Sequence, residues 1–129
     1  MSIAAYRRRK EAAETPRELE RRALTTVIGK LIEGQRQGGR VLLEACLLNS
    51  KLWSALVVDL ALPENALPDD LKARLISIGL WVQRYTLKAM SGAAVDPLID
   101  VNRNIAEGLA TNAPAAPAGQ ASLAQLGTV

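Results

Sequence analysis

The sequence of 129 residues contains no histidine, no phenylalanine and a single cysteine, and aromatic residues make up only 3% of it. Without histidine, and with one thiol, the chain lacks the usual ligands of a zinc site. It also lacks the imidazole base that commonly activates a catalytic thiol or hydroxyl. No glycine-rich phosphate-binding loop precedes a Lys-Ser or Lys-Thr pair. We therefore expect neither an enzyme nor a protein with a cofactor.

Two smaller features have a structural and a chemical interpretation. Cys46 lies in an apolar run, where we expect a small, buried and inert side chain, because one thiol cannot form an internal disulfide. Asp59 and Glu64 could be imagined as an acid–base pair. Their place at the end of a predicted helix favours capping, or hydrogen bonds within the following turn, instead.

The composition predicts an all-α protein of one domain. Hydrophobic residues make up 49% of the chain, enough to form a core. Leucine and alanine are strong helix formers, whereas strands favour aromatic and β-branched residues. No secretory signal is visible, and Ser54 and Asp59 interrupt the most apolar run before it reaches the length of a membrane span. We expect a cytoplasmic protein without a membrane contact.

Capping and breaking residues divide the chain into helices. The sequence Thr15-Pro16-Arg17-Glu18 is a capping box that starts a helix ending over Gly34 and the pair Gly38–Gly39. A second helix, over about 41–62, is so apolar that it must lie in the centre of a bundle or in an interface. The segment 63–68 is a proline-bounded turn that leads into a third helix. A short fourth helix starts at Asp96 and Pro97.

The fold class that follows is a small antiparallel helical bundle of three main helices plus a short fourth. Gly79 lies in the middle of the third helix, where glycine costs about 1 kcal/mol relative to alanine. A close approach of a neighbouring helix, under Trp53, would explain it. The predicted division is a basic segment over 1–14, a helical domain over 15–110 and a disordered Ala/Pro-rich tail over 111–129.

The net charge of +3 comes largely from a basic run near the start of the chain. It consists of Arg7, Arg8, Arg9 and Lys10. One interpretation is a solvated basic terminus, and the other is a contact with nucleic acid, although only Tyr6 is there to stack on a base. We do not expect nucleic acid to be a direct partner.

The central sequence resembles the FlaF family of bacterial flagellar biosynthesis regulators. The resemblance rests on LW-x(5)-DLA, then PENALP, then L-x(3)-LISIGLWV, and it extends over about residues 5–110. Ala5–Tyr6, the capping box and Glu20 agree with the start of such chains. The resemblance implies a cytoplasmic regulator that is needed for flagellin production and filament assembly. It implies two partners, flagellin, which it would bind as a secretion chaperone, and an FlbT-like regulator of flagellin messenger RNA.

The positions that match the family motif are either fold-defining or partner-binding. They are Trp53, Asp59, Leu60, Pro63, Glu64, Asn65, Leu67, Pro68, Ile78, Gly79, Trp81 and Val82. The terminal segments of flagellin are disordered in the monomer and helical in the filament, so an apolar groove walled by the second helix could bind them. One alternative is a regulator that binds RNA through Arg7–Lys10, with Arg17, Arg21 and Arg22 nearby. Another is an adaptor that binds FlbT alone.

Overall fold

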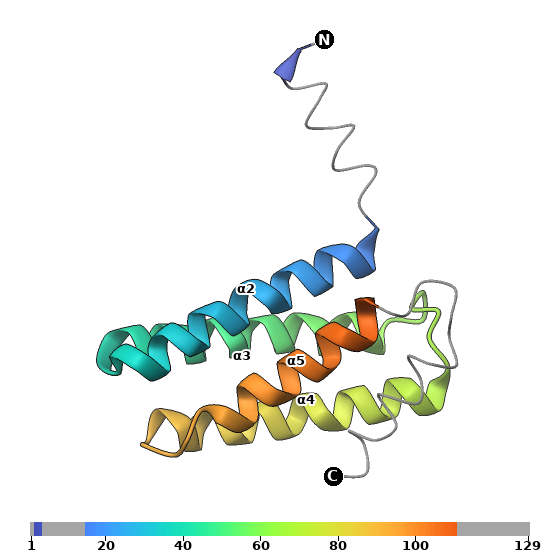
Figure 1. The fold of residues 1–129 in the computed structure, drawn as a ribbon. Coiled ribbons are helices and arrows are strands. Elements are labelled where there is room, and N and C mark those ends of the chain that lie inside the picture. Colours follow the sequence, from blue (N-terminus) through green and yellow to red (C-terminus); the bar gives the residue numbers. More distant parts are fainter. Residues whose placement is uncertain (1, 4–14, 111–129) are drawn as a thin grey trace.

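The computed structural model describes residues 2–3 and 15–110, and four α-helices form its folded part (Figure 1). They are α2 (Pro16–Gln37), α3 (Gly39–Ala61), α4 (Asp69–Met90) and α5 (Asp96–Ala110). Figure 1 shows that each helix runs in the direction opposite to the one before it, and the described residues contain no strand. The prediction of an all-α helical bundle is confirmed. The predictions for residues 1–14 and 111–129 concern segments outside the described residues, apart from Ser2 and Ile3.

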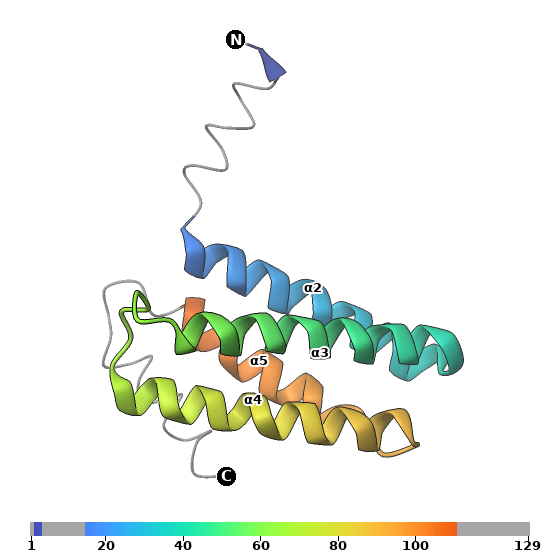
Figure 2. The same ribbon diagram turned by 180° about the vertical axis from the view of Figure 1, so that it is seen from behind.

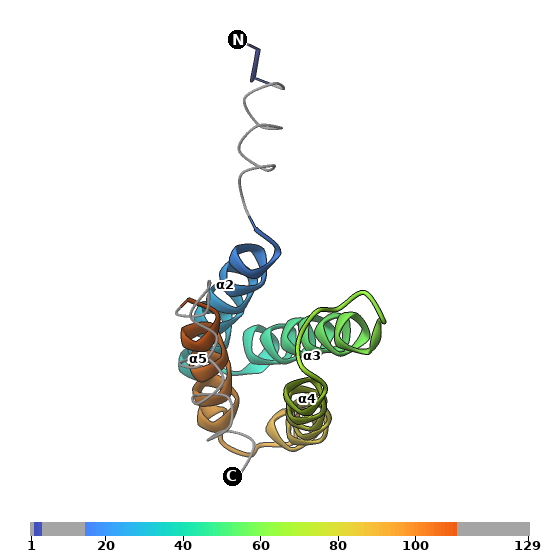
Figure 3. The same cartoon turned by 90° about the vertical axis from the view of Figure 1, so that its right-hand side faces the viewer.

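The helices follow one another around the bundle. α2 packs against α3 and α5, and α3 packs against α4 on its other side, as the end-on view in Figure 3 shows. Contacts between α4 and α5 are few. One flank of the α3–α4 pair therefore faces away from α2 and α5, and in Figure 2 no helix of the described chain lies in front of it.

The capping box at the start of α2 is formed as the sequence predicts. The Thr15 Oγ1 accepts a hydrogen bond from the Glu18 backbone N–H at 3.1 Å, and the Thr15 N–H donates to the Glu18 carboxylate at 3.2 Å. These two bonds satisfy backbone groups that have no partner inside the helix. Gly38, between α2 and α3, and Gly39, the first residue of α3, adopt positive φ angles of 68° and 53°, as expected for a sharp reversal.

Gly34 does not end the first helix, which corrects the prediction. It is buried inside α2, and a Cβ at this position would lie 2.8 Å from the Leu42 Cα. Gly34 therefore marks a point where the backbones of α2 and α3 approach closely. Gly79 has the role that we predicted for it between α3 and α4. A Cβ there would lie 2.5 Å from the Val57 Cγ2 and 3.4 Å from the Trp53 Cε3.

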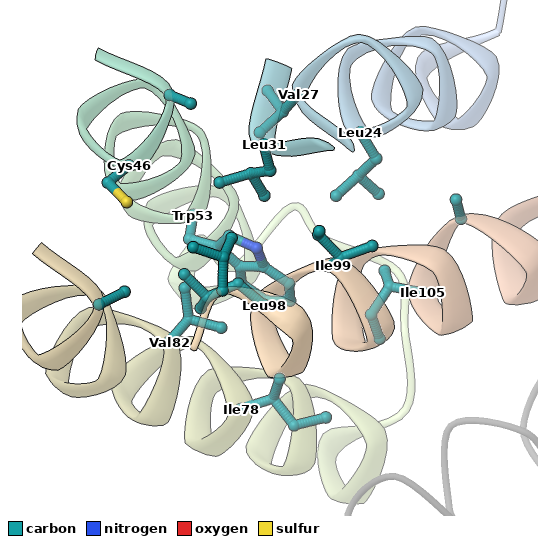
Figure 4. Close-up of a cluster of buried hydrophobic side chains, with 14 of the residues drawn as sticks. Leu24, Val27, Leu31, Cys46, Trp53, Ile78, Val82, Leu98, Ile99 and Ile105 are labelled. Carbon is teal, nitrogen blue, oxygen red and sulfur yellow. The ribbon is translucent and has the colours of Figure 1, made fainter. Parts of the chain in front are cut away.

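Side chains from all four helices meet in one core around Trp53 (Figure 4). Leu24, Val27 and Leu31 of α2 lie on one side of the indole, and Val82 and Ile78 of α4 lie on another. The fourth helix is a full member of this core, although its sequence stripe is weak, because it buries Leu98, Ile99 and Ile105. Cys46 is fully buried as predicted, and burial raises the pKa of its thiol.

α3 has the length and composition of a helix that could cross a membrane, which corrects the prediction that Ser54 and Asp59 leave the apolar run too short. In the fold, its inner face carries the buried Cys46, Asn49, Trp53 and Leu60. Its outer face leaves apolar side chains exposed, among them Leu47. The bundle-centre interpretation therefore describes the inner face of the helix, and the interface interpretation stays a prediction for its outer face.

Candidate functional site

A cavity of about 360 Å³ opens at one end of the bundle, where α3 ends and the chain turns into α4. This end lies on the right in Figure 1, where α2 begins and α5 ends. The apolar part of its wall comes from α3, the turn, α4 and α5. It consists of Trp53, Leu56, Leu60, Leu62, Ala66, Leu67, Leu75, Ile105 and Leu109. A largely apolar cavity with polar groups around it is the usual form of a binding site.

Hydrogen bonds fix the turn over 62–68, which forms one lip of the cavity. The Asn65 side-chain amide donates to the Asp59 carboxylate at 3.1 Å, and the Asn65 Oδ1 accepts from the Leu67 N–H at 3.1 Å. Asp59 is thus bonded within the turn, as we predicted in preference to an acid–base role with Glu64. The turn sets Leu67, which is half-buried, against the cavity.

The polar rim of the cavity is predominantly acidic. It carries the carboxylates of Glu20, Asp59 and Glu64 and the guanidinium of Arg17. Burial raises the pKa of Glu20, the negative charge of Asp59 raises it further, and Arg17 opposes both effects. The rim therefore holds more negative charge than its own cation balances, and a positive group bound there would relieve the repulsion.

A chain of buried hydrogen bonds holds the indole of Trp53 in the cavity wall. The Trp53 Nε1–H donates to the Asn102 Oδ1 at 2.8 Å, and the Asn102 Nδ2 donates to the Asn49 Oδ1 at 2.7 Å. Since indole can only donate, these bonds also fix the orientation of both amides. The Asn49 Nδ2 ends the chain with no acceptor among the described residues. We call these three residues the polar relay.

The structure divides the predicted motif residues into four groups. Six of them line the cavity, namely Trp53, Asp59, Leu60, Glu64, Asn65 and Leu67, while Pro63 and Pro68 bound the turn. Ile78, Gly79 and Val82 are buried in the core. Trp81 is only half-buried and stacks on Tyr85, with 5.1 Å between ring centroids. The motif thus does not form one continuous surface.

Sequence reasoning missed the contributions of the first and last helices to the cavity. Arg17 and Glu20 come from α2, and Ile105 and Leu109 come from α5. The sequence does contain one signal for the polar relay, because Asn102 falls four residues after Leu98 and thus in the apolar stripe of α5. Among the described residues, no group of three or more Cys, Asp or Glu side chains could hold a metal ion.

Comparison with known proteins places the chain in a family. A family model described as flagellar protein FlaF matches residues 2–109. No curated protein and no solved structure matches the chain. The matched region contains every helix of the bundle except the last residue of α5, and it includes all residues of the cavity and the polar relay. The protein therefore belongs to the FlaF family of flagellar proteins.

Proposed function

We propose that this member of the FlaF family binds unassembled flagellin in the cytoplasm as a secretion chaperone, and so links flagellin production to filament assembly. The observation that carries the proposal is the apolar cavity beside Trp53. An amphipathic segment that is disordered in the free monomer can order itself by placing its apolar side chains in such a cavity. A volume of about 360 Å³ suits a few side chains of one helical turn or two.

The charges of the rim indicate which charged residues the bound segment should contain. Three carboxylates surround the opening, and one of them, Glu20, already has a raised pKa. A lysine or arginine next to the apolar side chains of the bound segment would pair with these carboxylates. We therefore propose that the cavity binds a flagellin segment in which a basic residue flanks the apolar ones.

Calorimetric titration with purified flagellin monomer tests the proposal. Ala66 is exposed at the cavity, so Ala66→Trp should fill the opening without disturbing the core. We expect the wild-type protein to bind with a negative heat-capacity change and Ala66→Trp to lose roughly tenfold or more in affinity. Leu62→Lys, at an exposed position of the cavity wall, should have the same effect, because it replaces an apolar contact and repels the basic residue of the segment.

The matched control is Leu80→Lys, which introduces the same charge at an exposed leucine outside the cavity. It should bind flagellin with wild-type affinity. If Ala66→Trp and Leu62→Lys also bind with wild-type affinity, the cavity is not the flagellin site. RNA from the flagellin leader is the parallel titrant. Strongly salt-dependent RNA binding without flagellin binding would replace the chaperone proposal by the RNA-binding alternative.

We also propose that the protein acts beside an FlbT-like regulator, as the family resemblance implies. The affinity for FlbT is to be measured with and without flagellin present. If the chaperone couples the amount of free flagellin to FlbT, bound flagellin should change its affinity for FlbT. An affinity for FlbT that flagellin leaves unchanged, together with no flagellin binding, would favour the pure adaptor.

A further inference from the structure

The outer flank of the α3–α4 pair carries a second apolar surface, separate from the cavity. Its large exposed side chains are Leu43, Leu47 and Val58 of α3 and Leu80 and Leu87 of α4. Leu47 is 56% exposed, Leu80 52% and Leu87 68%. None of these five residues lines the cavity. Leucines exposed to this extent on two neighbouring helices are unusual for a surface without a partner.

Hydrogen bonds between the helices show that these side chains lie side by side. The Gln83 side-chain amide donates to the Ser50 carbonyl at 2.8 Å and to the Ser54 Oγ at 3.0 Å. Leu47 lies one turn before Ser50, and Leu87 lies one turn after Gln83. Because α3 and α4 run in opposite directions (Figure 2), both steps lead to the same level of the pair.

The same reasoning places Leu80 level with Ser54, and Leu43 and Val58 extend the surface at its two ends. From Leu43 to Val58 the surface runs roughly 22 Å along α3, the length of about four helical turns. We call this surface the outer groove, because it follows the line along which α3 and α4 meet. The hydrogen-bonded set of Ser50, Ser54 and Gln83 joins the two helices along this line.

Cations border the outer groove on both sides. On α3, Arg40 and Lys51 are exposed next to Leu43 and Leu47, and on α4 Arg84 and Lys88 are exposed next to Leu80 and Leu87. Glu44 is the acidic side chain on this stretch of α3. The border therefore carries four positive charges and one negative charge, which is the opposite of the acidic rim of the cavity.

We propose that the outer groove binds an amphipathic helix of a second partner protein, in which acidic residues flank the apolar stripe. Leucines along two antiparallel helices form the usual receptor for an apolar helix face. The cations complement acidic flanks and repel basic ones. A protein with both surfaces can hold a segment with basic flanks in the cavity and an acidic helix in the outer groove at the same time.

Charge argues against two other occupants, and polarity argues against a third. A second copy of the chain would bring Arg40, Lys51, Arg84 and Lys88 against the same cations. The segment 111–129 contains no Asp or Glu. An anionic membrane would attract the cations, but the hydrogen-bonded Ser54 and Gln83 place polar groups where a membrane-buried face would be apolar.

The test uses the full chain and a labelled synthetic helix of about 15 residues with a leucine stripe flanked by glutamates. A second peptide carries lysines in place of the glutamates. We expect the acidic peptide to bind, and added salt to weaken the binding. Leu47→Ser/Leu87→Ser should weaken it roughly tenfold or more, whereas Leu19→Ser, at an exposed leucine on α2, should leave it unchanged.

Charge reversal gives the second readout. Lys51→Glu/Arg84→Glu should weaken binding of the acidic peptide and strengthen binding of the basic peptide. Arg103→Glu, an exposed cation on α5, is the control and should change neither. Circular dichroism confirms that each variant keeps its helices.

Four results would overturn the proposal. The first is equal binding of the acidic and the basic peptide. The second is equal loss in Leu47→Ser/Leu87→Ser and in Leu19→Ser. The third is binding to vesicles of anionic lipid, abolished in the groove variant, without peptide binding, which would make the groove a membrane contact. The fourth is a wild-type dimer in analytical ultracentrifugation that the groove variant dissociates, which would make a second copy the occupant.

Discussion

The inner and outer faces of α3 are both apolar, but different groups of the same chain surround them. The inner face buries Trp53, which packs against side chains of α4 and α5 and bonds to Asn102. The outer face presents Leu47, which is 56% exposed, beside a border of cations. The inner face therefore holds the bundle together and forms the cavity, whereas the outer face contributes little to the stability of the isolated chain.

The comparison shows why the apolar composition of a helix does not reveal its role. Hydrophobicity alone would allow α3 to be a core helix, an interface or a membrane span. The hydrogen bonds and the neighbouring charges distinguish the faces. A buried polar relay marks the inner face, and exposed leucines between lysines and arginines mark the outer one.

The largest difference between the two faces should appear in the free energy of unfolding. Trp53→Ala should lower it by about 3–5 kcal/mol, because a fully buried indole leaves a cavity in the core. Leu47→Ala should change it by less than about 1 kcal/mol, since the leucine is mostly exposed. Trp81→Ala, at a half-buried ring, should fall between them. Urea denaturation measures all three, and equal losses for Trp53 and Leu47 would contradict the division into faces.

The next effect concerns the polar relay on the inner face. Asn102→Leu leaves the Trp53 Nε1–H and the Asn49 side chain without partners, and should cost about 1–3 kcal/mol. Asn49→Leu removes the Asn49 Nδ2 donor, which has no acceptor, and leaves the Asn102 Nδ2 donor without its acceptor. The number of unpaired buried donors therefore stays the same, and the cost should be clearly smaller. The two variants are to be compared by denaturation under identical conditions. A larger loss for Asn49→Leu would show that its amide has a partner that the described residues do not provide.

Two glycines of α2 extend the comparison to a second helix. Gly34→Ala should destabilise the protein by about 1–3 kcal/mol, because the new methyl group meets the backbone of α3 at Leu42. Gly29→Ala should stabilise it by about 0.5–1 kcal/mol, since no atom lies within 4 Å and alanine favours the helix. Thermal unfolding separates the two. A stabilising Gly34→Ala would mean that α2 and α3 do not approach closely there.

The smallest effect concerns the acidic rim and depends on pH. The raised pKa of Glu20 means that its ionised form is disfavoured in the folded state, so ionisation costs stability above that pKa. Glu20→Gln should therefore increase the free energy of unfolding at neutral pH, by less than about 1 kcal/mol because the group is partly exposed. The gain should disappear below the ordinary glutamate pKa of 4.5, where Glu20 is protonated in both states. A gain that is independent of pH would contradict this origin.

The sequence predicted the parts of the fold that depend on local chemistry. The capping box at Thr15, the proline-bounded turn and the all-α bundle all follow from residues close together in the chain. The close approach at Gly79 was also predictable, because a glycine in mid-helix needs a reason. The prediction that Gly34 ends a helix is wrong, since a glycine that ends a helix and one that lets another helix approach look alike in sequence.

The candidate site was predictable only in part. Six motif residues around the turn do line the cavity, but the residues from α2 and α5 come from chain segments far apart in sequence. The packing of all four helices decides whether the face of α2 that carries Arg17 and Glu20 meets the turn after α3. Trp81 shows the converse, because it lies within the motif and yet stacks on Tyr85 outside the cavity.

The most direct test of the central claim uses the only two tryptophans of the chain, Trp53 and Trp81. Labelling the protein with ¹⁵N at tryptophan gives two indole signals in an NMR spectrum, one from the cavity wall and one from outside it. Unlabelled peptides that cover the two terminal segments of flagellin are then added in turn. The claim predicts that one of them shifts the Trp53 signal and leaves the Trp81 signal in place. A bound peptide that shifts Trp81 alone, or neither signal, would show that the cavity is not where flagellin binds.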